Sequence, residues 1–266
     1  MRPFSDYHMH TPLCGHAVGE PEEYVRQAIK VGLKEIGFSD HAPLLSYDDP
    51  SITMSRTQLP QYHKMIEDVR KKYPQIRILT GIEADFLPGY EKETKELLAG
   101  YPYDYVIGSV HFIKSWAFDN PDHREEWMKK DVNRVYRDYY EVLRQSAASG
   151  LFTVLAHVDL VKKFGNMPTE DFSAEVAKTA KVFKSAGVLI EINTSGLRKP
   201  VKEIFPSLAN LKVYQKAGVP ITFGSDAHDP QDVGRDFDKG AAWAKEAGYK
   251  EYVLLRNRKI DRSVKL

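Results

Sequence analysis

Residues 6–16 read DYHMHTPLCGH and place three of the chain's nine histidines within eleven positions. The segment 6–10 is predicted to be a short β-strand, and Thr11-Pro12 and Gly15 predict a turn after it. Side chains two residues apart on a strand point to the same side, so His8 and His10 can bind one ion together. His16 follows in the loop. This stretch therefore predicts a strand whose C-terminal end carries metal ligands.

The rest of the chain alternates similar strands with helices. Short β-rich runs are separated by longer segments of helical periodicity, which is the pattern of βα units around a parallel sheet. Strands are expected at 6–10, 35–39, 77–83, 104–110, 152–157, 187–193 and 219–224, with 251–256 as an eighth candidate. Helices are expected near 20–32, 57–73, 90–99, 124–149, 173–186, 207–217 and 238–247. No linker or repeat divides the sequence, so we expect one α/β domain spanning residues 1–266.

Composition limits the functions of such a domain. Basic and acidic residues nearly cancel, for a net charge of +1, and no basic run marks a nucleic-acid-binding surface. No stretch approaches the roughly 20 apolar residues of a membrane span, and the N-terminus lacks an apolar signal segment. The single cysteine, Cys14, excludes an intramolecular disulfide and is typical of a reducing compartment. We expect a cytoplasmic protein that binds neither nucleic acid nor membranes, and the sequence leaves its oligomeric state open.

Residues that can carry chemistry gather at the predicted C-terminal ends of the strands. In a parallel barrel these ends meet at one mouth, so residues distant in sequence come close together. Seven of the nine histidines stand at a strand end or in the loop after it: His8, His10, His16, His41, His111, His157 and His228. Carboxylates occur at the same positions: Asp40, Glu83, Asp85, Asp159, Glu191 and Asp226. The long connections 42–56 and 112–123 also follow strand ends, and we expect them to be lids or binding loops.

This set of side chains exceeds what one metal ion needs. A zinc-like ion takes four or five ligands, so the set suits two or three divalent ions. Nitrogen and oxygen donors favour Zn, Mn or Fe over a sulfur-bound centre.

Several neighbouring residues have two open interpretations. Asp40 and Asp85 either fix imidazole tautomers or only cap loops, and Glu191 and Asn193 either support the site or only satisfy neighbouring polar groups. Cys14 is interpreted as a bystander and His63 as an exposed helix residue. His123 is expected near a helix N-terminus, where contact with a substrate is the minor alternative.

Seven short motifs occur in a fixed order along the chain. They are HxH at 8–10, a further histidine at 16, DH at 40–41, GIE at 81–83, SVH at 109–111, HVD at 157–159 and SDAH at 225–228. This order resembles the polymerase and histidinol phosphatase (PHP) superfamily. Within it, the stretches GIEADF, YDYVIGSVHF and SGLRKP are most similar to the stand-alone histidinol-phosphate phosphatases of histidine biosynthesis.

The resemblance implies a single distorted (β/α)7 TIM-like barrel with a metal site at the C-terminal strand ends. It implies three ions, the first held by His8, His10, Glu83 and Asp226. Glu83 would bridge to a second ion held by His111 and His157, and a third would use His16, His41 and His228. In relatives, a basic residue after the fifth strand and another after the sixth bind the substrate phosphate. The nearest matches are Lys163 and Arg198, with Lys162 and Lys199 as alternatives one position away.

The implied reaction is metal-dependent hydrolysis of the phosphomonoester L-histidinol phosphate to L-histidinol and phosphate. Metal ions lower the pKa of bound water towards ~7, so we expect direct attack by a metal-bridging hydroxide and no phosphoenzyme. Glu83 is the expected bridging residue, and Asp226 or His228 the expected proton donor to the leaving alkoxide. The alternatives are a nucleotide phosphodiesterase or phosphatase, a phosphotyrosine-protein phosphatase, a proofreading nuclease module and a non-catalytic metal-binding barrel.

Overall fold

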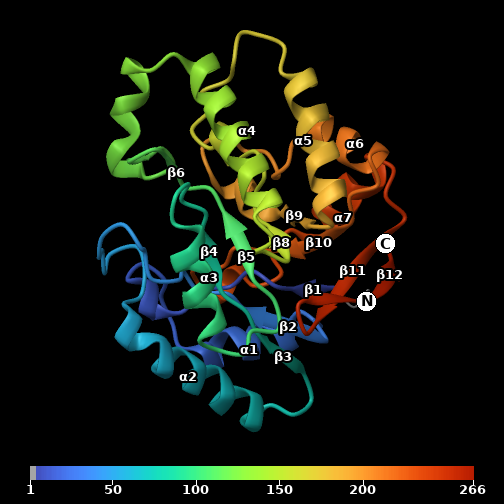
Figure 1. Ribbon diagram of the computed structural model, residues 1–266. Coiled ribbons are helices and arrows are strands. Elements are labelled where there is room, and N and C mark those ends of the chain that lie inside the picture. Colours follow the sequence, from blue (N-terminus) through green and yellow to red (C-terminus); the bar gives the residue numbers. More distant parts are fainter. Residues whose placement is uncertain (1–3) are drawn as a thin grey trace.

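Short parallel strands alternate with helices in a computed structural model that describes residues 4–266 (Figure 1). One three-stranded sheet contains β1 (Ser5–Asp6), β2 (Glu35–Phe38) and β3 (Arg77–Thr80). A five-stranded sheet contains β4 (Glu83–Asp85), β5 (Ile107–Ser109), β8 (Val154–Leu155), β9 (Leu189–Asn193) and β10 (Ile221–Gly224). All pairs within these two sheets are parallel, which confirms the predicted α/β class.

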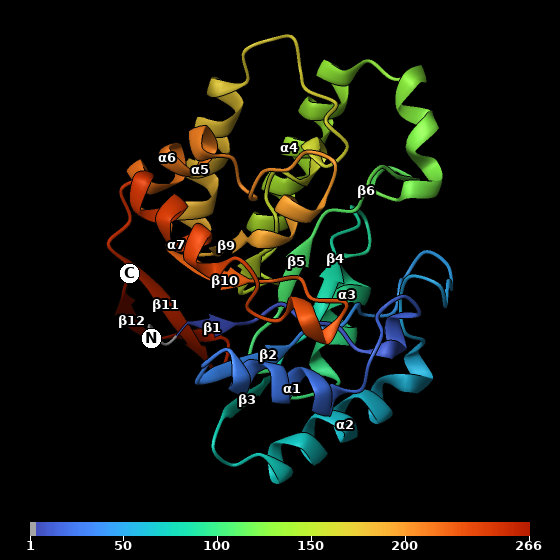
Figure 2. The same ribbon diagram turned by 180° about the vertical axis from the view of Figure 1, so that it is seen from behind.

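Helices cover the outside of both sheets. They are α1 (Pro21–Lys30), α2 (Leu59–Lys72), α3 (Glu91–Ala99), α4 (Val132–Ala148), α5 (Ser173–Ala186), α6 (Leu208–Lys216) and α7 (Phe237–Glu246). In both views α4, α5 and α6 lie on one side of the strands, and α1 and α2 lie on the opposite side (Figures 1 and 2). Every residue of β9 and β10 is buried, including the polar residues Glu191 and Asn193 at the C-terminal end of β9.

The predicted strand 77–83 is divided between the two sheets. β3 pairs with β2, whereas β4 pairs with β5, and residues 81–82 join them. Gly81 lies against the ring of Tyr105, where an added Cβ would come within 2.3 Å of Cζ. The Gly81 amide donates to Phe38 O at 2.7 Å, and the Glu83 amide donates to Asp40 O at 3.1 Å. The segment 77–85 therefore runs beside β2 and the residues after it, although its first part, β3, belongs to the three-stranded sheet and its second part, β4, to the five-stranded sheet.

Hydrogen bonds also connect the segment after β1 with the segment after β10. The Tyr7 amide donates to Phe223 O at 3.2 Å, and the His10 amide donates to Ala227 O at 3.0 Å. The Ala227 amide donates back to His8 O at 3.2 Å. These bonds bring the HxH segment and the SDAH segment side by side.

Three further predicted elements differ from the structure. The strand predicted at 6–10 is β1 at Ser5–Asp6 alone, and Met9 adds only an isolated bridge to Ala227, so His8 and His10 lie after the strand and not on it. The helix predicted at 124–149 is a 3-10 helix at Pro121–Lys129 followed by α4, because Asp131 is extended and caps α4 through the Arg134 amide at 3.2 Å. The eighth strand candidate, 251–256, is β11 (Glu251–Arg256), which is antiparallel to β12 (Lys259–Lys265) and pairs with none of the parallel strands. The Leu255 amide donates to the Tyr7 hydroxyl at 3.1 Å, which fixes this hairpin beside β1.

Shorter elements form the connections between these units. Two-residue strands β6 (Phe112–Ile113) and β7 (Trp116–Ala117) make a hairpin inside the long connection 112–123. Further 3-10 helices lie at Pro12–Cys14, Arg56–Gln58, Leu160–Lys162, Thr194–Arg198 and Pro230–Asp232. Within residues 4–266, no helix is both long and apolar enough to cross a lipid bilayer.

Candidate metal centre

Glu83 lies at the middle of the predicted ligands, at the start of β4, and its side chain is buried. Three imidazole nitrogens face its Oε2: His8 Nε2 at 3.2 Å, His10 Nε2 at 3.6 Å and His41 Nδ1 at 3.0 Å. Two face its Oε1: His157 Nε2 at 3.3 Å and His111 Nε2 at 3.8 Å. The two carboxylate oxygens therefore face different groups of histidines.

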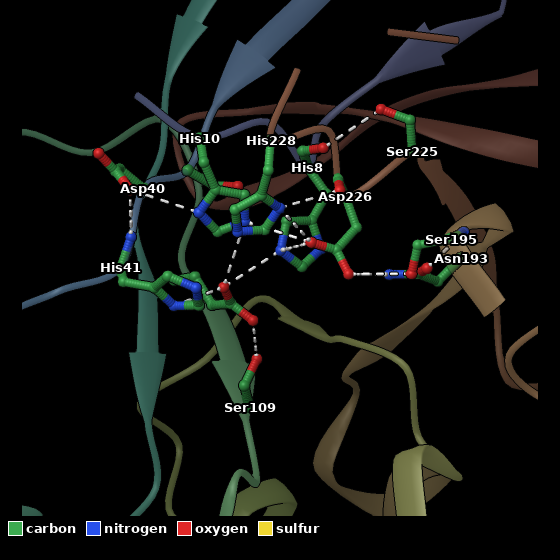
Figure 3. Close-up of polar contacts among 12 residues, drawn as sticks. His8, His10, Asp40, His41, Ser109, Asn193, Ser195, Ser225, Asp226 and His228 are labelled. Atoms are coloured by element: carbon green, nitrogen blue, oxygen red, sulfur yellow. Dashed lines mark hydrogen bonds and ion pairs between the residues drawn. The ribbon is translucent and has the colours of Figure 1, made fainter. Parts of the chain in front are cut away.

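Asp226 forms a second point of convergence. Its Oδ1 lies 3.9 Å from His8 Nε2, 3.4 Å from His10 Nε2 and 3.4 Å from His228 Nδ1. Figure 3 shows these three imidazoles turned towards the Asp226 carboxylate. The Ser195 hydroxyl donates to Oδ2 at 3.0 Å and orients the carboxylate. Asp226 has a φ of 53°, in the left-handed region that non-glycine residues rarely adopt, so the surrounding fold holds this carboxylate in place.

Carboxylates hold the far nitrogen of three histidines. Glu191 Oε1 lies 2.8 Å from His8 Nδ1, Asp40 Oδ1 lies 3.3 Å from His10 Nδ1, and Asp85 Oδ1 lies 3.0 Å from His111 Nδ1. Such a contact fixes the tautomer of the neutral imidazole, in which Nε2 keeps its lone pair towards the centre. Of the open interpretations, the structure favours tautomer fixing for Asp40 and Asp85 and a supporting role for Glu191.

Gly224 is required at the end of β10 by this arrangement. A Cβ at this position would lie 1.7 Å from Glu191 Oε1 and 2.6 Å from His8 Cβ. Glycine therefore lets the carboxylate of Glu191 lie over the strand and reach His8. Sequence reasoning missed this residue, since a glycine at a strand end ordinarily indicates only a turn.

His16 and Cys14 lie at the outer side of the centre. His16 Nδ1 is 3.0 Å from Cys14 O and 3.2 Å from Ser51 O, so the loop 42–56 helps to orient it. The buried Cys14 thiol, which sequence reasoning set aside as a bystander, lies within 4.8 Å of ligand atoms of His16 and His228.

The centre has the unpaired lone pairs that a cation requires. Buried atoms without a hydrogen-bond partner in the described part of the chain include His8 Nε2, His10 Nε2, Glu83 Oε2 and His228 Nε2. Ligand atoms within 4.8 Å of one another form five groups there, of which two include Cys14. The other three are His8 with His10 and Asp226, His41 with Glu83 and His111, and His10 with His41 and His228. Buried polar atoms are normally paired, so this convergence fits bound metal ions.

The pKa shifts divide the ligands into two groups. Burial lowers the pKa of His16 to about 4 and holds the pKa of His228 well below its usual value, so both imidazoles are neutral. Burial alone would raise the pKa of Glu83, but the charges of His8 and His41 bring it well below its usual value. Burial also lowers the pKa of His8, His10 and His111, but neighbouring carboxylates outweigh it and raise the pKa of His8 and His10 well above the usual value and that of His111 to about 10. Metal binds neutral imidazoles and ionised carboxylates, so bound metal would displace the proton of each of these three histidines.

The profile of the PHP domain matches residues 6–195. This chain belongs to the PHP domain family. A probable histidinol-phosphatase of Deinococcus radiodurans is 39% identical over 257 residues, which is 96% of this chain and 98% of that protein. The histidinol-phosphatase of Bacillus subtilis is 31% identical and covers 88% of this chain and 96% of its own length.

Solved structures of PHP proteins share the fold. Histidinol phosphate phosphatase from Lactococcus lactis, crystallised with zinc, L-histidinol and phosphate, superposes with a TM-score of 0.84. It is 25% identical and covers 98% of this chain and 99% of its own. A putative histidinol phosphatase from Listeria monocytogenes superposes with a TM-score of 0.78 at 26% identity, over 88% of this chain and 99% of its own.

A cavity of about 510 Å³ opens at the candidate metal centre. Histidines 16, 41, 111, 157 and 228 line it, and so do Glu83 and Asp226. Both long connections contribute to its wall, through residues such as Thr53 and Asp119. Their predicted position beside the site is thus observed.

The four basic residues that were candidates for phosphate binding divide between the cavity and the core. Lys163 lines the cavity, whereas Lys162 is only 2% exposed and donates to Glu203 Oε2 at 2.7 Å and to Ile204 O at 3.0 Å. Arg198 and Lys199 both line the cavity. Arg198 is anchored by Nη2 donating to Ser225 O at 2.6 Å and by Nε at 3.0 Å from Asp232 Oδ2, and its buried Nη1 has no partner among the described residues.

The two histidines predicted outside the cluster do lie outside it. His63 was expected to be exposed, and this is wrong: it is half-buried and its ring stacks on Tyr101 with centroids 4.3 Å apart. A helical period cannot reveal this contact, because the loop that carries Tyr101 packs across α2. His123 is exposed in the first turn of the 3-10 helix 121–129, where Glu126 Oε1 lies 2.9 Å from its Nδ1.

Proposed function

We propose that this chain is a metal-dependent phosphomonoesterase that hydrolyses L-histidinol phosphate to L-histidinol and phosphate. The observation that carries the proposal is a cavity with convergent, unpaired ligand atoms on its floor and Lys163, Arg198 and Lys199 in its wall. Bound metal ions and cationic side chains are what a phosphate ester requires. The histidinol-phosphatase relatives match nearly the whole chain, which favours this ester over others.

We further propose two or three bound divalent ions, with Zn, Mn and Fe as the candidates. His8, His10, Glu83 and Asp226 would hold one, and Glu83 with His111 and His157 a second. His16, His41 and His228 would hold a third. Nitrogen and oxygen donors suit these metals, and zinc is present in the related crystal structure from Lactococcus lactis.

When bound, such ions lower the pKa of water and withdraw charge from phosphoryl oxygens. The chain's own groups then do the rest. Arg198, with its guanidinium held by Ser225 O and Asp232, presents Nη1 to the phosphate, and Lys163 adds a second positive charge. A water-derived oxygen attacks phosphorus in line, and the bond from phosphorus to the ester oxygen breaks. Asp226 or His228 accepts the proton that the attacking water loses and carries it to the leaving alkoxide. No side chain becomes phosphorylated.

We also infer that the strands close into a distorted (β/α)7 barrel and that residues 1–266 are one domain. Hydrogen bonds between the segments after β1 and β10, and between β2 and the third strand, support a continuous ring. In such a ring β3 and β4 count as one strand. Closure places all the strand ends that carry ligands at one mouth.

Steady-state hydrolysis of a substrate panel by the metal-loaded protein tests the activity. The panel contains L-histidinol phosphate, nucleoside monophosphates, a nucleotide phosphodiester and a phosphotyrosine peptide. We expect kcat/KM to be highest for L-histidinol phosphate. A higher value for another substrate would assign the site to that substrate, and no turnover by a fully loaded protein would support a non-catalytic metal-binding barrel.

A further inference from the structure

The cavity wall carries charges of both signs. Lys163, Arg198 and Lys199 suit an anionic substrate, but Asp119, from the loop between β7 and α4, lines the same cavity. A carboxylate close to a phosphate-binding group weakens phosphate binding by electrostatic repulsion. Its presence therefore needs a physical reason other than binding of the phosphate.

Asp119 is bonded to one of these basic residues. Lys163 Nζ donates to Asp119 O at 2.7 Å and to Asp119 Oδ2 at 2.9 Å. The side chains of Lys163 and Asp119 are only 14% and 17% exposed, so water screens the pair less than it screens a surface ion pair. The contact spans 44 residues and holds the 112–123 loop against the segment after β8.

Each member of the pair keeps one unused hydrogen-bonding position. An ammonium group has three N–H donors, and Asp119 takes two of them, which leaves one for a ligand. Asp119 Oδ1 receives no hydrogen bond from residues 4–266. A donor on a cation and an acceptor on an anion are thus available side by side.

We propose that Asp119 binds the ammonium group of an aminoalkyl phosphate substrate while Lys163 binds its phosphate. This inference rests on the proposed function and names the feature of the substrate that the site selects. In L-histidinol phosphate the carbon that bears the ammonium group is bonded to the carbon that bears the phosphate ester. Opposite charges are therefore close together in the substrate, as they are in the Asp119–Lys163 pair. Asp119 determines specificity, because an ester without the amine cannot use its free oxygen.

The test compares two esters on the metal-loaded protein and its Asp119→Asn variant. One ester is L-histidinol phosphate, and the other is the analogue in which hydrogen replaces the amino group. A bond between an ammonium and a carboxylate is worth about 10- to 100-fold in affinity, so we expect a preference of this size in wild-type kcat/KM. Asp119→Asn should remove most of the preference by raising KM for L-histidinol phosphate, with little change for the analogue. Calorimetry should show weaker binding of the product L-histidinol and unweakened binding of inorganic phosphate.

Glu125→Gln is the matched control. It removes one negative charge from the 3-10 helix that follows the same loop, and Glu125 is exposed and lies outside the cavity wall, so it should leave the ratio between the two esters unchanged. An equal loss on both esters in Asp119→Asn, with weaker phosphate binding, would overturn the proposal, because Asp119 would then only position Lys163. An unchanged ratio would overturn it as well. Failure of the wild-type protein to hydrolyse L-histidinol phosphate at all would instead refute the proposed function, and the inference with it.

Discussion

Lys162 offers a quantitative test of how the substrate cavity is supported. Its ammonium donates to Glu203 Oε2 at 2.7 Å and Ile204 O at 3.0 Å, lies 3.1 Å from Asp159 Oδ2, and stands 5.3 Å from the centre of the Phe205 ring. Together these contacts tie the segment after β8 to the loop that follows Arg198. Lys162→Met keeps most of the side-chain volume and removes the charge.

The expected cost follows from the burial of the two carboxylates. Removing one partner of a buried ion pair costs about 3–5 kcal/mol. Glu203 is 32% exposed and can regain water, whereas Asp159 is 2% exposed and cannot, so we expect the lower end of that range, about 3 kcal/mol. For a chain of this length that corresponds to a fall in Tm of about 6 °C.

Unfolding by guanidinium and calorimetry measure the change in the free energy of unfolding. Lys181→Met, on the exposed face of α5, is the control, and its free energy of unfolding should stay within about 0.5 kcal/mol of the wild type. The double variant Lys162→Met/Asp159→Asn should recover part of the loss. In the wild type the Ser207 amide donates to Asp159 Oδ2 at 2.7 Å. The amide oxygen that Asp159→Asn introduces can accept the same hydrogen bond and leaves no unpaired charge in the core. A Lys162→Met variant as stable as the control, or a double variant with simply additive losses, would refute the reasoning.

Four further outcomes are expected. Gly224→Ala should lower activity or metal affinity about 10- to 100-fold by displacing Glu191 from His8, whereas Gly100→Ala, whose Cβ would meet only Leu97 O at 3.3 Å, should change neither. Chelation should abolish turnover, and Zn, Mn or Fe should restore it together with measured metal content; turnover by metal-free protein would contradict a metal-dependent reaction. Hydrolysis of a chiral-phosphate ester should invert the configuration at phosphorus, since attack is in line and occurs once, and retention would indicate a phosphoenzyme. Arg198→Lys should raise KM for L-histidinol phosphate about 10-fold, because an ammonium group cannot reach Ser225 O, Asp232 and the phosphate together. Arg235 also contacts Asp232 but its side chain is 54% exposed, so Arg235→Lys should leave KM unchanged.

The strand ends and their histidines could be predicted because both follow simple geometric rules. Side chains alternate along a strand, and parallel strands end at the same edge, so His8, Glu83 and Asp226 could be placed together without coordinates. The supporting carboxylates were harder, because Asp40 at a strand end serves equally well as a cap or as a partner of His10.

Other features depend on tertiary contacts, which the periodicity of the sequence does not reveal. Lys162 and Lys163 are consecutive, and only the path of the 3-10 turn at 160–162 decides that one enters the core and the other the cavity. The sequence of residues 251–256 predicts a strand but not its partner. The antiparallel hairpin of β11 with β12 could therefore not be distinguished from an eighth parallel strand. The requirement for Gly224 comes from Glu191, a residue on the neighbouring strand.

The seam between the segments after β1 and β10 has a consequence for biosynthesis. His8 and Asp226 are 218 residues apart, and the bonds of Ala227 to the HxH segment join them. During synthesis the imidazoles of the HxH segment emerge from the ribosome first, and their partner Asp226 emerges only after the residues that separate them in the sequence. A truncated product that ends before Asp226 would therefore lack a complete ligand set at this seam.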